Sequence, residues 1–167
     1  MKKKIIITGG LGYIGTELCK LYSGVSWNHQ VIVIDNRFIS ERVNQIRNWN
    51  MEFIQGDILD KKLVEKYFKN ADVVHHLAGI TDVPRTKSEA SEVQDAKILE
   101  VGQKGTQNIL DAIDNKCKII FPSTHVVYEG INEVKKEIKE NEITKPILSY
   151  STSKAINEKQ LKNSGKN

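Results

Sequence analysis

The chain has 167 residues, of which 39% are hydrophobic and 28% are charged, and this balance indicates one globular domain. The net charge of +4 is small, and no basic stripe is interleaved with aromatic residues. A nucleic-acid partner is therefore not expected.

The start of the chain argues against a secretory signal or a membrane span. After Lys2–Lys4, the apolar run Ile5–Ile7 is short and ends in Thr-Gly-Gly, which suits a buried strand. No other run approaches the length needed to cross a membrane. The two cysteines, Cys19 and Cys117, are far apart and lack a CxxC spacing, so we expect a reduced, cytoplasmic location.

Short β-branched runs alternate with helix-like segments along the whole chain. We expect strands at 4–8, 30–35, 52–55, 72–77 and 118–122, helices at 13–22, 40–49, 60–69, 91–113 and 149–161, and loops at 81–91 and 129–146. Asp60 is a plausible N-cap, and the long helix 91–113 is expected to break near Gly102 and Gly105.

The strand runs are continuously apolar, which is typical of strands covered on both faces. Strands of this kind alternating with helices predict an α/β fold with a doubly wound parallel sheet. Right-handed crossovers then give the strand order 3-2-1-4-5. We expect one Rossmann-type domain over residues 1–161 and a frayed tail over 162–167.

A glycine-rich turn follows the first expected strand and opens the first helix. Its Gly9, Gly12 and Gly15 allow a tight turn and a close approach of phosphate oxygens to backbone amides. Such turns also occur for packing alone, but here Asp35 ends the next strand, where a carboxylate can bind adenosine ribose hydroxyls. A carboxylate there repels a 2′-phosphate, which favours NAD over NADP, although Arg37 could reach such a phosphate.

Six strings in this order resemble the extended short-chain dehydrogenase/reductase family, and more narrowly the NAD-dependent epimerase/dehydratases of nucleotide sugars. They are TGGLGYIG, VIVID, GDILD, HLAG, STHVVY and YSTSK, and they lie within residues 4–161. Members of this family continue for roughly as many residues again. The resemblance therefore implies the N-terminal part of an epimerase or dehydratase, truncated before the substrate domain, and we expect little turnover from this chain alone.

The resemblance also implies the rest of the cofactor site. Asp57 would meet the adenine amino group and Ile58 would pack nearby. Leu77, Ala78 and Gly79 would line the path to the nicotinamide, although strand-end packing explains Leu77 and Ala78 equally well. The full set of further cofactor contacts implied in this way is Tyr13, Ile14, Asn36, Asp57, Ile58, Leu77, Ala78, Gly79, Tyr150 and Lys154.

Tyr150 and Lys154 stand four residues apart, so they project from one face of the last expected helix. A phenol is a poor base near neutral pH, but a neighbouring ammonium favours its phenolate form. Alone, this pair would more often be a surface pair, and the preceding motifs favour a catalytic one. The resemblance implies that Tyr150 exchanges a proton with a sugar hydroxyl, Lys154 holds the nicotinamide ribose, and Thr124 hydrogen-bonds the reacting oxygen.

The outcome of the reaction stays open between epimerisation, dehydration and reduction. The 4,6-dehydratases of the family carry an Asp-Glu pair directly after the threonine, and His125-Val126 here disfavours that type. Gly102 stands where the family commonly has an asparagine that shapes a water-linked proton path, which leaves that relay in doubt. Glu129 stands where a glycine is expected after the tyrosine.

Three readings of the chain follow. It is the N-terminal part of such an enzyme acting on a nucleotide sugar, or a half-enzyme completed by a partner chain, or a non-catalytic dinucleotide-binding module. Family members pair through two long helices, here 91–113 and 149–161, which implies a homodimer. His75 and His76 are adjacent on a strand and point to opposite faces, so we assign no metal.

Overall fold

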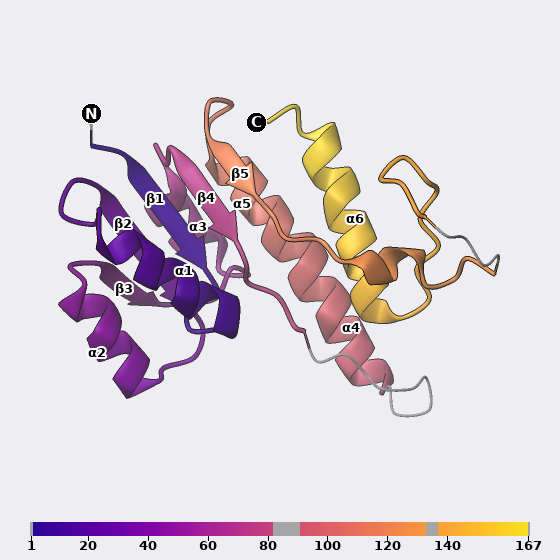
Figure 1. The fold of residues 1–167 in the computed structure, drawn as a ribbon, viewed down its shortest axis with the longest axis horizontal. Helices are drawn as coiled ribbons and strands as arrows, with labels where there is room; N and C mark the ends of the chain where they lie inside the picture. The colour runs from indigo at the N-terminus through magenta and orange to yellow at the C-terminus, as the bar shows by residue number, and fades with distance from the viewer. Residues whose placement is uncertain (1, 82–90, 133–136, 167) are drawn as a thin grey trace.

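A single five-stranded parallel sheet forms the centre of the protein, with helices on both faces (Figure 1). The computed structural model describes residues 2–81, 91–132 and 137–166, so parts of the two expected loops lie outside the described residues. The strands are β1 Lys4–Thr8, β2 Gln30–Asp35, β3 Glu52–Gln55, β4 Val73–His76 and β5 Lys118–Ile120, in the order β3-β2-β1-β4-β5. The predicted strand order and parallel arrangement are confirmed.

The helices also follow the expected plan, with differences at their ends. They are α1 Tyr13–Ser23, α2 Ser40–Asn48, α3 Lys61–Phe68, α4 Glu92–Glu100, α5 Thr106–Ala112 and α6 Ser149–Asn163, with the short 3₁₀ helix η3 at His125–Tyr128. The expected N-cap Asp60 is confirmed, because its side chain accepts a hydrogen bond from the Leu63 amide. Helix α6 runs two residues into the segment expected to fray.

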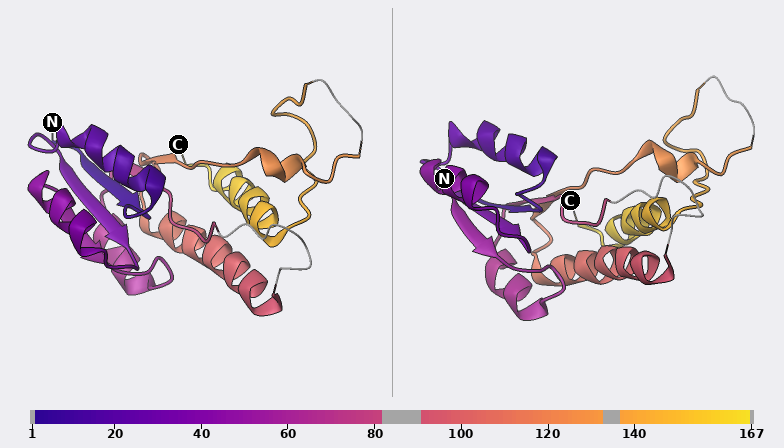
Figure 2. Two further views of the ribbon diagram at one scale, coloured as in Figure 1. Left: turned by 60° about the horizontal axis from the view of Figure 1, so that its bottom comes forward. Right: turned by 90° about the horizontal axis from the view of Figure 1, so that it is seen from below.

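The long helix is interrupted at the predicted place, near Gly102 and Gly105. The interruption is a π-helical stretch, η2, at Val101–Gly105, through which the helix passes from α4 into α5. The widened turn lies where α6 packs alongside, as the two views of Figure 2 show. A Cβ atom at Gly102 would lie 2.0 Å from Ser153 Oγ, so the absence of a side chain permits this close packing. Single π turns of this kind often occur at functional sites.

Two apolar clusters cover the two faces of the sheet. Successive strand residues point to opposite faces, so Ile6 and Ile7 of β1 enter different clusters. Ile6 packs in the cluster that contains Phe68 of α3 and Ile109 of α5. Ile7 packs in the cluster that contains Val43 of α2. This burial on both faces explains the continuously apolar strand sequences.

We expect replacement of Asp60 by alanine to lower the free energy of unfolding by about 1 kcal/mol, because the variant loses the N-cap of α3. Asp60→Asn keeps an acceptor for the Leu63 amide and should lose less. Urea unfolding followed by circular dichroism measures both variants. Equal stability of wild type and Asp60→Ala would contradict this role for the side chain.

Candidate active site

The predicted site residues gather at the carboxyl edge of the sheet. Thr8, Asp35 and His76 end β1, β2 and β4, and the segment after β5 leads to Thr124. Ligands of open α/β sheets bind at this edge, in the crevice where the strand order reverses. Here the reversal lies between β1 and β4, because β2 and β3 extend to one side and β5 to the other.

The glycine turn is built from contacts that leave no room for side chains. Gly9 has a φ of 66°, and a Cβ atom there would lie 2.8 Å from the Ala78 nitrogen. A Cβ atom at Gly15 would lie 2.4 Å from the Gly9 carbonyl oxygen. The Gly9 amide donates to Ile34 O at 2.8 Å, which joins the turn to β2. The turn thus lies against both strands that flank β1.

The N-terminus of α1 can accept an anion. Gly12 is its N-cap and provides no capping side chain, and the first turn contains no acidic residue. First-turn amides lack acceptors within a helix, and the helix dipole places partial positive charge there. Tyr13 and Ile14 are 85% and 61% exposed at this end, so solvent reaches it. The arrangement fits a phosphate group.

Asp35 lies beside the turn, as the sequence predicts, and is already engaged. Its Oδ2 accepts from the Leu11 amide at 2.9 Å, and its Oδ1 accepts from the Arg37 amide at 3.0 Å. The Arg37 guanidinium adds contacts of 3.2 Å to Oδ1 and 3.4 Å to Oδ2. The Asp35 side chain is 3% exposed and that of Arg37 is 57% exposed, so the arginine covers the carboxylate.

The next expected contacts form a second group at the end of β3. Asn36 Nδ2 donates to Asp57 Oδ2 at 3.2 Å, and Asp57 Oδ1 accepts from the Leu59 amide at 2.9 Å. Ile58 is buried, and its side chain packs against Gly105, where a Cβ atom would lie 2.3 Å from Ile58 Cδ1. The structure therefore joins Asn36 and Asp57, whereas the Ile58 side chain packs in the apolar cluster that contains Ile109 of α5.

Leu77, Ala78 and Gly79 continue from β4 at the other side of the turn. Thr8 Oγ1 accepts from the amides of Leu77 at 3.1 Å and Ala78 at 3.0 Å, which fixes the chain where it leaves the strand. Gly79 is exposed, with open space around its Cα. The backbone here runs directly beside Gly9.

Helix α6 carries Tyr150 and Lys154, and the lysine reaches the segment that leaves the carboxyl end of β5. Lys154 Nζ donates to Pro122 O at 2.9 Å and lies 4.4 Å above the centre of the Phe121 ring. The same Nζ lies 5.9 Å from the centre of the Tyr150 ring. Burial lowers the pKa of the Lys154 ammonium below that of a free lysine. The two side chains are neighbours, and the lysine is anchored to the segment that leaves β5.

Thr124 begins the 3₁₀ helix η3, which packs against α6. Its Oγ1 accepts from the Val126 amide at 3.4 Å, and an accepting hydroxyl keeps its hydrogen to donate to another group. Ser123 Oγ donates to Glu158 on α6. His125, the open candidate beside the threonine, is exposed.

The family of the chain follows from comparison with known proteins. The sequence matches the NAD dependent epimerase/dehydratase family over residues 5–167. The chain belongs to this family.

Three relatives illustrate the range of the family. The chain is 36% identical over 130 residues to a UDP-N-acetyl-alpha-D-glucosaminuronate decarboxylase of Bacillus cytotoxicus, covering 77% of this chain and 38% of that protein. It is 30% identical to a UDP-glucose 4-epimerase of Neisseria meningitidis serogroup C, covering 95% and 47%. The crystal structure of UDP-glucose 4-epimerase from Brucella ovis in complex with NAD superposes with a TM-score of 0.76 at 30% identity, covering 96% and 47%. The chain spans less than half the length of these relatives.

Glu129 is a site residue whose role the sequence did not reveal. Its Oε1 accepts from the amides of Ile147 at 2.7 Å and Leu148 at 2.8 Å, and from Ser151 Oγ. These groups lie at the start of α6, whose own N-cap, Leu148, has no side-chain acceptor. In the sequence, Glu129 stood out only as a charged residue where glycine was expected. The residues that Glu129 binds lie 18 to 22 positions further along the chain.

His75 and His76 do point to opposite faces. His75 Nε2 contacts Tyr22 OH at 2.8 Å, on the side of α1, whereas His76 Nε2 contacts Thr106 Oγ1 at 2.9 Å, on the side of α5. Among residues 2–81, 91–132 and 137–166, no group of three or more His, Cys, Asp or Glu residues could hold a metal ion. No helix within these ranges is long and apolar enough to cross a membrane.

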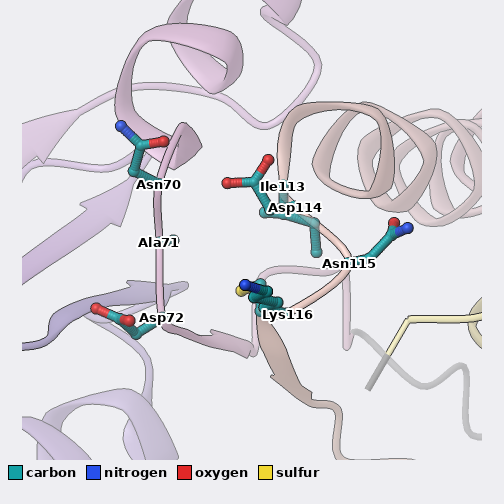
Figure 3. A pocket seen from close by; sticks show the side chains of 8 residues that line it. Asn70, Ala71, Asp72, Ile113, Asp114, Asn115 and Lys116 are labelled. Atoms are coloured by element: carbon teal, nitrogen blue, oxygen red, sulfur yellow. The ribbon is translucent and has the colours of Figure 1, made fainter.

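One cavity lies away from the site. It has a volume of about 640 Å³ between residues 70–72, which precede β4, and residues 113–117, which precede β5 (Figure 3). Both segments lead into their strands, so this cavity is at the amino edge of the sheet. Cys117 lines it, and burial raises the pKa of this thiol to about 11, which makes it a poor nucleophile.

We expect Glu129→Gln to destabilise the protein by about 1 kcal/mol at pH 7, because hydrogen bonds to a charged acceptor are stronger than those to a neutral one. Burial alone would raise the pKa of Glu129, but the bonds from Ser151 and from the Leu148 and Ile147 amides together lower it. A lowered pKa in the folded state gives stability above the unfolded pKa of 4.5 that is lost as the pH falls through the folded value.

Urea unfolding from pH 7 to pH 3 tests this, and the difference between wild type and Glu129→Gln should shrink as the pH falls. The exposed Glu140→Gln in the same loop is the matched control and should show no such difference. A Glu129→Gln effect that stays constant with pH would show that the charge of the carboxylate is not involved.

Proposed function

We propose that the chain is the NAD-binding and catalytic part of a nucleotide-sugar oxidoreductase of the epimerase/dehydratase type, with Tyr150 as the acid and base. The observation that carries the proposal is the position of Lys154. Its Nζ is bound to Pro122 O beyond β5 and lies beside the Tyr150 ring, at the edge where the glycine turn opens. A purely structural Tyr-Lys pair would not need to lie at this edge.

The residues present fit NAD. The first turn of α1 would hold the pyrophosphate, and the Asp35 carboxylate would accept from the adenosine ribose hydroxyls. Asp57 and Ile58 would meet the adenine. A carboxylate at this position disfavours a 2′-phosphate and so favours NAD over NADP, although Arg37, which contacts Asp35, could reach such a phosphate. The related structure from Brucella ovis contains NAD, which supports the same choice.

The chain's own residues would handle the proton of the substrate. NAD supplies hydride acceptance and donation at the sugar carbon when it is bound. Tyr150 would take the proton from the hydroxyl on that carbon, and the Lys154 ammonium, 5.9 Å from the ring centre, would favour the phenolate. The Thr124 hydroxyl, whose hydrogen is not used by the Val126 amide, would donate to the reacting oxygen.

The substrate would be a nucleotide sugar, since the named relatives act on such compounds. The chain places His125 and Val126 directly after Thr124, and valine has no acid or base to offer to the removal of water. This composition disfavours a 4,6-dehydratase. A homodimer through α4, α5 and α6 and a cytoplasmic location stay predictions.

The cofactor proposal is tested by calorimetric titration with NAD and NADP. We expect Asp35→Asn to weaken NAD binding severalfold, because the ribose hydroxyl would lose a charge-assisted contact whose gain is partly offset by the Arg37 contact that it displaces. The same change should narrow the preference for NAD over NADP. Asp111→Asn, an exposed acid on α5, is the control. A folded wild-type protein that binds no NAD, or an Asp35→Asn variant that binds it equally well, would contradict the proposal.

The catalytic proposal is tested with Tyr150→Phe. We expect NAD affinity to stay within about twofold of wild type, since the ring remains, while turnover falls at least about 100-fold through loss of the acid and base. Chromatography of UDP-glucose and UDP-N-acetylglucosamine incubated with the protein measures turnover. Tyr67→Phe on α3 is the matched control. Unchanged turnover in Tyr150→Phe would exclude this residue as the acid and base.

A further inference from the structure

Four polar side chains form a continuous buried path between the sheet and α6. They are Thr8 of β1, His76 of β4, Thr106 of α5 and Asn157 of α6, and none is more than 3% exposed. We call these four residues the polar string. Polar groups at this depth are stable only when hydrogen-bonded, so the direction of each bond can be worked out from donors and acceptors.

At Thr8, the partners of the hydroxyl determine which groups donate and which accept. Its Oγ1 accepts from the amides of Leu77 and Ala78, which uses both lone pairs of the oxygen. The hydroxyl can then only donate, and its remaining partner is His76 Nδ1 at 3.2 Å. His76 Nδ1 must therefore accept and carries no proton.

The other ring nitrogen of His76 then carries the proton. Neutral imidazole has one N–H, so Nε2 donates to Thr106 Oγ1 at 2.9 Å. Burial and the nearby Lys154 charge lower the pKa of His76 to about 3, so the ring is neutral at physiological pH. The geometry selects one of the two neutral tautomers, the one protonated on Nε2.

Asn157 completes the string from the side of α6. Its amide nitrogen faces Gly102 O at 2.9 Å, and a carbonyl oxygen can only accept, so this end of the amide is the NH₂ group. The same NH₂ group donates to Thr106 Oγ1. Thr106 thus accepts from His76 and from Asn157, while Ser153 Oγ donates to Asn157 Oδ1 at 3.4 Å.

The buried side chains of α6 are polar. Among the described residues, they are Ser151, Ser153 and Asn157. Apolar packing is not directional and tolerates sliding, whereas a hydrogen bond weakens when its length or angle changes by a small amount. A helix held in this way has a defined position along its axis.

We propose that the polar string is a positioning device that fixes α6, with Tyr150 and Lys154, against the edge formed by Gly9 and Ala78, and that it holds His76 as the neutral Nε2–H tautomer. Its consequence for chemistry rests on the function proposed above, because only then do Tyr150 and the Ala78 edge act on the same substrate. His76, Thr106 and Asn157 are positioning residues and touch no reacting atom.

The matched pair Thr106→Val and Thr106→Ser separates this role from simple packing. Valine keeps the shape but removes the hydroxyl, which leaves His76 Nε2–H without its acceptor and removes the link between His76 and Asn157. Asn157 Nδ2 then keeps only Gly102 O and Gln160 Oε1 as acceptors. Serine restores the acceptor. If α6 is released in Thr106→Val, Lys154 loses its fixed place at Pro122 and becomes more hydrated.

The experiment is NMR of the protein with labelled histidine and lysine. In wild type we expect ¹⁵N shifts of His76 that report a protonated Nε2 and a bare Nδ1, unchanged from pH 8 to pH 5. In Thr106→Val the measured pKa of Lys154 should rise toward that of a free lysine, and in Thr106→Ser it should match wild type. With substrate, turnover of Thr106→Val should fall about tenfold relative to Thr106→Ser.

Two results would overturn the inference. One is a wild-type His76 that is protonated on Nδ1 or that titrates in this pH range, a measurement that needs no variant to fold. The other is a folded Thr106→Val protein in which the Lys154 pKa and the turnover equal those of Thr106→Ser. Absence of NAD binding by the wild type would instead contradict the proposed function, since the tautomer and the Lys154 pKa are measured without cofactor.

Discussion

The close approach of Gly9 to the backbone that leaves β4 is the constraint on which the rest of the site depends. With a φ of 66° and no room for a Cβ atom beside the Ala78 nitrogen, only glycine lets the chain turn here directly after β1. The turn aims α1 so that its first amides face the carboxyl edge, and Thr8 fixes the opposite wall by accepting from the Leu77 and Ala78 amides. One backbone contact therefore fixes the glycine turn relative to the segment that leaves β4.

The two ends of the site are held by different forces. The glycine turn and Asp35 rest on strands whose side chains fill two apolar clusters, so their positions follow from burial on both faces of the sheet. Helix α6 instead buries serines and an asparagine, and it is held by Glu129 at its start and by Asn157 in its middle. Burial thus supplies stability at one end, and directional hydrogen bonds supply position at the other.

This division explains how far the sequence alone could predict the structure. Strand order, the Asp60 cap and the place of Asp35 depend on local patterns or on general rules of parallel sheets, and they were predicted. The π-helical stretch at Val101–Gly105 was not, because it depends on how closely Ser153 approaches Gly102 from a helix some fifty residues on. Glu129 was noticed only as a departure from the family pattern, since nothing in its neighbourhood shows that it binds the start of α6.

The contacts between Arg37 and Asp35 could not be predicted from the sequence either. They bear on how the Asp35 carboxylate would bind a ribose hydroxyl. Asp35 Oδ1 accepts from the amide and Nε of Arg37, and Oδ2 accepts from Leu11 N and Arg37 Nη2. A carboxylate offers about four acceptor positions, so all are in use. In the proposed function, a ribose hydroxyl that binds Asp35 would therefore replace the guanidinium, and the net affinity would be the difference between two charge-assisted contacts. The amides of Leu11 and Arg37 would hold the carboxylate in place in such an exchange.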